Sequence, residues 1–152
     1  MQYLEVKNYD FNRKLSANFM LGELIQSSSA YNQKLYVQYM NNPEIVQNLK
    51  FLCDALLQPI RDQIRRPVVI TSGYRCSALN SLVGGAKNSL HLHGYAADIY
   101  CDGAMLELAR VIQTLRYHEC LIHDSYIHVS IKPMYNEMRY RNLTSDRRFD
   151  FL

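Results

Sequence analysis

The sequence predicts an α+β fold, with helices packed on one face of a small antiparallel sheet. Three observations predict it. Apolar residues recur every three or four positions in two separate stretches, which indicates amphipathic helices. Several short runs rich in β-branched residues have the length and composition of strands. The last two of these runs lie close enough in sequence to form a hairpin, which favours antiparallel pairing.

Two helices are predicted in the first half of the chain. A short one covers Phe19–Ala30 and runs into a cluster of serines. The second begins at Asn42-Pro43-Glu44, because asparagine is a good N-cap, proline suits the first helical position and an acid favours the first turn. Pro59 should kink or split this helix near Gln58. Its apolar stripe consists of Ile45, Leu49, Leu52 and Leu56.

The next part of the chain alternates strands with a helix. Val68–Thr71 reads as a first strand and Ala96–Cys101 as a second. Between them lies a long polar segment with a predicted helical turn at Ser77–Val83, and irregular segments of this length usually carry function. Asp102 is expected to cap a following helix. The apolar stripe of that helix consists of Met105, Leu108, Ala109, Ile112 and Leu115.

The predicted hairpin consists of two short strands, Cys120–His123 and Tyr126–Ile131. Beyond it, residues 134–152 carry four arginines and three acidic residues, so we expect a solvated surface tail there. The chain of 152 residues, 48% of them apolar, suits a single domain over 1–152, with its core at about 19–133.

Composition excludes several classes of protein. The net charge of +3 is small and scattered, so no nucleic-acid partner is expected. No apolar stretch approaches the ~20 residues of a membrane helix, so no membrane insertion is expected. The first residues lack the pattern of a signal peptide, which predicts a protein made in the cytoplasm; we expect a monomer. The four cysteines form no C-x-x-C pair and read as buried thiols.

Strand alternation separates a few polar side chains from the core. In Tyr126–Ile131, His128 lies on the face opposite the apolar residues, and Asp98 does the same in its own strand. If the two strands are neighbours, Asp98 and His128 converge. His91 can reach the same point because Gly94 lets the intervening loop turn back. Two histidines and a carboxylate suit Zn²⁺ with an open position for water, on the sheet face opposite the helices. The alternative is a polar sheet face with chance histidines.

Several motifs extend this pattern and together resemble one family, the zinc D-alanyl-D-alanine carboxypeptidases. That family includes D-Ala-D-Ala dipeptidases, phage endolysins that cut L-alanyl-D-glutamate bonds, and the hedgehog signalling domain. The chain is most similar to its small phage-type cell-wall peptidases, over roughly Phe19 to Pro133. The motifs are Ser72-Gly73-Tyr74-Arg75-Cys76, Leu79-Asn80, Val83-Gly84-Gly85-Ala86-Lys87-Asn88-Ser89-x-His91-x-x-Gly94-x-Ala96-Ala97-Asp98-Ile99 and Ile127-His128-Val129-Ser130.

The resemblance assigns roles to most of these polar residues. It implies that the zinc ligands are His91, Asp98 and His128. Arg75 matches the arginine that binds the scissile carbonyl oxygen, and a fixed cation aimed at developing negative charge is often a large catalytic contribution. A surface salt bridge is the alternative for Arg75. Ser89 matches a serine that helps to hold the substrate, and its alternative is a loop-stabilising hydroxyl.

The stretch before the last histidine departs from the family pattern. Tyr126 stands where a tryptophan is expected, and we assign it to substrate binding; Cys120 stands where a glutamine is expected. Asp124 falls where the family has a glutamate as general base, so the resemblance implies that role for Asp124. Aspartate is shorter by roughly 1.5 Å, and a misplacement of about 1 Å can cost ~10²-fold in rate. The alternative is an aspartate of the hairpin turn.

These features predict a zinc peptidase that cleaves peptidoglycan stem or cross-link peptides. The resemblance implies a D-Ala-D-Ala carboxypeptidase or an L-Ala-D-Glu endopeptidase, of phage or prophage origin. It would act on the cell wall after release, or in the cytosol as a dipeptidase. One alternative is a catalytically weakened zinc-binding module of the same fold, which binds peptidoglycan or a partner. Another is a metal-free phosphoesterase with two H-x-S/T motifs, of which only His128-Val129-Ser130 is present.

Overall fold

A five-stranded sheet forms the centre of the protein, in a computed structural model that describes residues 12–26, 44–134 and 137–151. Its strands are β1 (Val69–Ser72), β2 (Ala96–Tyr100), β3 (Glu119–Ile122), β4 (Ile127–Ser130) and β5 (Arg139–Asn142). Their order across the sheet is β1-β2-β4-β3-β5. The first four strands pair antiparallel with their neighbours, as predicted, and β3 and β4 form the expected hairpin.

The fifth strand corrects one prediction. Residues 134–152 were expected to be a solvated tail, but β5 pairs parallel with β3 at the edge of the sheet. The tail interpretation is therefore wrong for the residues of β5, although many of the described residues of this segment are exposed. Tyr140 accounts for the difference, because it packs against the core and its hydroxyl donates a hydrogen bond to the carbonyl of Phe149. A short 3₁₀ turn, η4 (Arg147–Phe149), follows and contacts α6 (Met105–Ile112).

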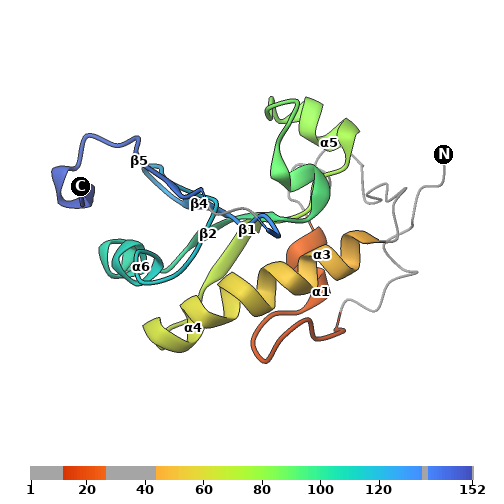
Figure 1. Cartoon of the computed structure of the whole chain (residues 1–152), viewed down its shortest axis with the longest axis horizontal. Coiled ribbons are helices and arrows are strands. Elements are labelled where there is room, and N and C mark those ends of the chain that lie inside the picture. The colour runs from red at the N-terminus through yellow and green to blue at the C-terminus, as the bar shows by residue number, and fades with distance from the viewer. Residues whose placement is uncertain (1–11, 27–43, 135–136, 152) are drawn as a thin grey trace.

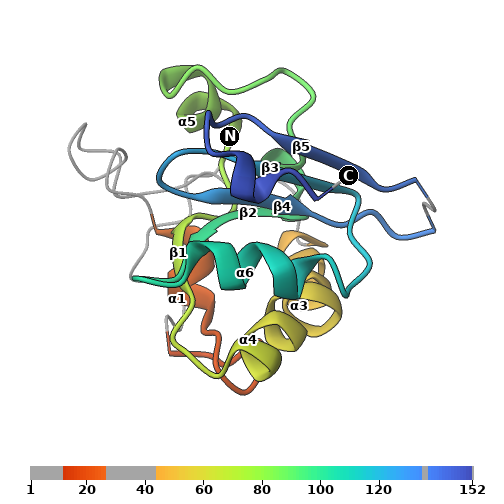
Figure 2. The same cartoon turned by 90° about the vertical axis from the view of Figure 1, so that its left-hand side faces the viewer.

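Most helices lie on one face of the sheet, as Figures 1 and 2 show. These are α1 (Leu21–Ile25), α3 (Glu44–Leu52), the π-helical segment η2 (Cys53–Leu57), α4 (Gln58–Ile64) and α6. The opposite face carries α5 (Ser77–Leu82), which belongs to the long polar segment together with the 3₁₀ turn η3 (Leu90–His93). The predicted α+β architecture is confirmed, with most helices on one face and the short helix α5 on the other.

Pro59 acts as predicted, since the helix changes type just before it. Five residues of π-helix precede α4, and Pro59 lies in the first turn of that helix. Leu57 is itself helical, so Pro59 lies inside a continuous helix, where it removes one backbone hydrogen bond and the change of helix type accompanies that loss. The buried stripe of this long helix is as predicted, with Ile45, Leu49, Leu52 and Leu56 all 3% exposed or less. The proposed cap Asn42 and residues 27–30 lie outside the described residues.

Asp102 does not cap α6, which corrects a second prediction. The N-cap residue is Ala104, and it makes no side-chain cap. Instead, the amide of Ala104 donates to the carbonyl of Cys101, and Gly103 has a left-handed φ of 69°. Asp102 and Gly103 therefore form the centre of a tight turn, for which an Asp-Gly pair is well suited.

The core lies between the sheet and the helix layer. Ile99, Ile127 and Val129 point into it from the two central strands and have no exposed surface. All four cysteines are free and buried, which confirms that they are internal thiols. None of the helices in the described residues is long and apolar enough to cross a membrane. This packing fixes which side chains of each strand remain on the other face.

Candidate metal centre

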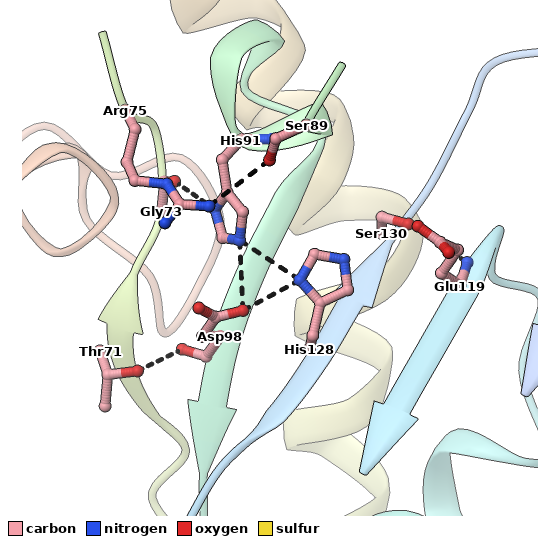
Figure 3. A network of polar contacts seen from close by, with 9 residues as sticks. All are labelled: Thr71, Gly73, Arg75, Ser89, His91, Asp98, Glu119, His128 and Ser130. Atoms are coloured by element: carbon pink, nitrogen blue, oxygen red, sulfur yellow. Dashed lines mark hydrogen bonds and ion pairs between the residues drawn. The ribbon is translucent and has the colours of Figure 1, made fainter. Parts of the chain in front are cut away.

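Two neighbouring strands bring Asp98 and His128 together. The two residues are direct partners in the β2–β4 ladder. Because the adjacent residues Ile99 and Ile127 point into the core, alternation places Asp98 and His128 on the face away from the helix layer. The Nδ1 atom of His128 lies 3.0 Å from Oδ1 of Asp98, and Figure 3 shows the two side chains facing each other across the strands.

His91 reaches the same point from the long polar segment. It belongs to η3, which ends at Gly94 with a left-handed φ of 78°. The ring is 1% exposed, and its Nε2 lies 3.2 Å from Oδ1 of Asp98 and 3.3 Å from Nδ1 of His128. Its other nitrogen, Nδ1, lies 2.7 Å from the carbonyl oxygen of Gly73 (Figure 3). Only an N–H can be bonded there, so neutral His91 presents an unprotonated Nε2 to the other two ligands.

The three donor atoms fit a zinc ion. They lie 3.0 to 3.3 Å apart. Zinc–ligand bonds of about 2.0–2.1 Å in a tetrahedron place neighbouring donors about 3.3–3.4 Å apart. Nitrogen and carboxylate oxygen are both ligands that zinc accepts, and three protein ligands leave a fourth position for water or substrate. The prediction that these residues converge is thus met by the geometry of the side chains.

The charge of Asp98 is held in place by the two imidazoles. Burial by itself would raise the pKa of this carboxyl group, but the close polar contacts with the imidazoles of His128 and His91 outweigh burial and keep the pKa well below its ordinary range. Asp98 is therefore a carboxylate at neutral pH. A half-buried negative charge beside two nitrogen donors is the electrostatic arrangement that a divalent cation requires.

Arg75 and Ser89 lie beside this group. Nη2 of Arg75 is 3.4 Å from Oγ of Ser89, a long hydrogen bond, and the same Oγ accepts one from the amide of His91 at the start of η3. Within the described part of the chain, the Nε atom of Arg75 is buried and has no hydrogen-bond partner. Burial lowers the pKa of Arg75, while the nearby charges of Asp98 and Tyr126 raise it. Buried donors without a partner are uncommon, so this nitrogen is available to a ligand or a water molecule.

Tyr126 faces the same site from the start of β4. It lies two residues before His128, so its side chain is on the same side of the sheet. Its ring stacks on that of His123, with centroids 4.4 Å apart and planes 15° from parallel. Burial and the negative charge of Asp98 raise the pKa of the Tyr126 hydroxyl, and Arg75 lowers it. Tyr126 and His128 are two residues apart on the same side of the strand, so their side chains are neighbours on the metal face.

Asp124 is placed differently. It is exposed at the tip of the β3–β4 hairpin and lines a cavity of about 570 Å³, together with residues of α6 and η4. The structure thus gathers six of the predicted site residues and does not bring Asp124 to them, so its role as general base stays a prediction. His123 was not among the predicted site residues. It lies two residues after Leu121, the direct partner of His128, so alternation along the strand places it on the metal face. Strand parity alone could have placed His123 on this face.

Comparison with known proteins agrees with this arrangement. A family model described as Peptidase M15 matches residues 17–130, which contain every residue of the site. The chain is also similar to a protein of Streptomyces albus G named zinc D-Ala-D-Ala carboxypeptidase, with 47% identity over 34 residues. That match covers 22% of this chain and 13% of the length of the Streptomyces protein.

Proposed function

Since this chain belongs to the Peptidase M15 family, we propose that it is a zinc peptidase that cleaves peptidoglycan peptides, either at a terminal D-Ala or at the L-Ala-D-Glu bond. The observation that carries the proposal is the group of His91, Asp98 and His128, whose donor atoms are spaced for zinc and leave one coordination position open. The family match and the named Streptomyces relative support the peptidase chemistry. A phage or prophage origin stays a prediction.

The cofactor is zinc, and these three residues hold it. Bound zinc supplies a water of lowered pKa and polarises a carbonyl group. The carbonyl of Gly73 fixes the tautomer and orientation of His91. These contacts prepare the donor set before the ion arrives, so little rearrangement is needed on binding.

Arg75 has the position and the free donor for binding an oxyanion. It is a half-buried guanidinium next to the donor group, with an unpaired Nε among the described residues. A cation fixed in a partly dry site stabilises developing negative charge more strongly than one in water. Ser89 orients this guanidinium, and Tyr126 offers an aromatic surface and a hydroxyl to the substrate.

The general base is the open part of the mechanism. Asp124 is one candidate, because of its place in the sequence pattern, and His123 is the other, because it shares the face of the donor group and stacks on Tyr126. An imidazole is the side chain that enzymes use most often to transfer protons. We therefore propose His123 as the side chain to test first, with Asp124 as its direct comparison.

The test is mass spectrometry of purified peptidoglycan after incubation with the zinc-loaded protein. We expect release of a peptide or D-Ala, abolished by a chelator and by His128→Ala, and the product mass identifies the bond. If zinc is bound at one equivalent and several chemotypes of peptidoglycan release nothing, the peptidase proposal is wrong. The second candidate, a zinc-loaded binding module, then applies; the exposed placement of Asp124 favours it, because such a module needs no base.

A further inference from the structure

The face that carries the metal centre continues across β3 and β5. In the register of the sheet, Asp98 is opposite His128, His128 is opposite Leu121, and Leu121 is opposite Arg141. These four residues form one row across four strands. Arg141 lies beyond residues 17–130, which are the part matched by the family model. The family match therefore says nothing of the role of Arg141, which has to be argued from the structure.

The side chain of Arg141 points to the metal face. Its neighbour Tyr140 packs against the core on the other face, and successive side chains of a strand alternate. Arg141 is exposed, and in the described part of the chain it has no ion pair. Arg139, two residues earlier on the same face, differs in having Glu119 within 3.5 Å of its Nη1. Arg141 thus presents a guanidinium that is open to a ligand.

The position of Arg141 sets how far along a substrate it can act. Strands are about 4.8 Å apart, so the Cα atoms of His128 and Arg141, two strands apart, are separated by roughly 10 Å. An extended peptide advances about 3.3 Å per residue, so about three residues span that distance. Figure 1 shows α5 above the β1 side of the sheet, whereas among the described elements no helix covers β5 on this face. An extended peptide that is bound at the metal centre and crosses β3 would bring its third residue close to Arg141.

We propose that Arg141 binds a free carboxylate of the peptide substrate, about three residues from the bond that is cut. This inference rests on the proposed peptidase function and adds a specificity residue to it. A guanidinium binds a carboxylate through two parallel hydrogen bonds, whereas an amide at the same place offers one acceptor and no charge. The protein therefore prefers substrates in which this group is a free acid over those in which it is amidated.

The experiment uses two synthetic stem peptides that are identical except at the residue about three positions from the cut bond. One peptide has a free carboxylate there, and the other has the corresponding amide. The zinc-loaded full chain is compared with Arg141→Gln, Arg141→Lys and Arg147→Gln, the last as a matched control on η4 near the helix face. We expect kcat/KM of the wild type to favour the acid by about three- to tenfold, through KM, as one charge-assisted hydrogen-bond pair implies. Arg141→Gln should abolish this preference, Arg141→Lys should retain part of it, and Arg147→Gln should keep it.

Two results would overturn the inference: equal kcat/KM of the wild type for both peptides, or an undiminished preference in Arg141→Gln. Neither would affect the proposed function, because hydrolysis of the amidated peptide tests the peptidase by itself. Conversely, if the wild type cuts neither peptide, a binding measurement with the same pair decides. A difference in affinity between acid and amide that Arg141→Gln removes supports the carboxylate site, and no such difference overturns it.

Discussion

Replacing Gly73 by alanine tests whether zinc binding depends on the backbone contact that holds His91 in place. A Cβ atom at residue 73 would lie 2.3 Å from the carbonyl oxygen of Leu24 and 2.9 Å from its Cα and carbonyl carbon. All three are backbone atoms of α1, which cannot rotate away as the end of a side chain can. The strand end and α1 must therefore separate by about 1 Å to reach an ordinary contact distance.

This separation has two costs that can be worked out from contacts. The amide of Tyr74 donates a 2.7 Å hydrogen bond to the same carbonyl of Leu24, and its loss contributes about 0.5–1.5 kcal/mol. Overpacking adds about 1–3 kcal/mol. We expect a loss of about 2–4 kcal/mol in the free energy of unfolding, which corresponds to a fall in Tm of about 5–15 °C for a chain of this size.

The same shift moves the carbonyl of Gly73, which holds Nδ1 of His91. Loss of such a supporting contact typically weakens metal binding 10–100-fold, so zinc affinity should fall by that factor. Affinity is measured by competition with a chromophoric chelator, and stability by thermal melting with and without zinc. Gly84→Ala is the matched control, because its Cβ meets nothing within 4 Å and its φ of 70° costs only local strain of about 1–2 kcal/mol. A folded Gly73→Ala protein that binds zinc within twofold of wild type would refute this reasoning.

Four further predictions follow from the site and the core. Alanine at any one of the three zinc ligands should lower zinc content from about one equivalent to a small fraction, measured by elemental analysis; full occupancy in all three variants would remove the metal assignment. Arg75→Ala should lower kcat by about 10²–10³-fold with zinc content unchanged, and unchanged turnover would contradict an oxyanion role. His123→Gln should lower kcat by about 10²-fold or more while Asp124→Asn changes it less than threefold, and the reverse order would restore Asp124 as the base. Burial raises the pKa of both Cys53 and Cys120 to about 12, so these thiols stay protonated at pH 8 and should react with iodoacetamide only after unfolding; rapid alkylation of the folded protein would show that the core opens.

The orientation of the site residues on β2 and β4 could be predicted from the sequence, because burial of one sheet face makes inward and outward side chains alternate along each strand. His128 and Asp98 fall between apolar neighbours, so their orientation follows from packing alone. The distance between them depends on β2 and β4 being neighbours, which strand patterns do not specify. The same alternation places His123 on the metal face, but the family pattern pointed to its neighbour Asp124 as the base.

The strand β5 and the turn at Asp102 were not predicted, for two other reasons. Of the four residues in β5, only Tyr140 is an apolar anchor, so the alternation of the strand is hidden among charged residues. Its partner β3 is also distant in sequence, and long-range pairing leaves no local signature. Asp102 was misjudged because an aspartate before a helix suits both a cap and a turn. The glycine that follows, with its left-handed φ, decides for the turn.

The position of β5 at the edge of the sheet also bears on association between molecules. An edge strand presents unpaired amide and carbonyl groups that can recruit a strand from another molecule, and short, charged edges resist this. β5 is four residues long and carries two exposed arginines, so charge at this edge of the sheet disfavours pairing with a strand of another molecule. Beneath it, β3 has the apolar sequence Cys120-Leu121-Ile122. We expect a chain shortened before β5 to expose β3 as the edge strand and to associate through it more readily than the full chain.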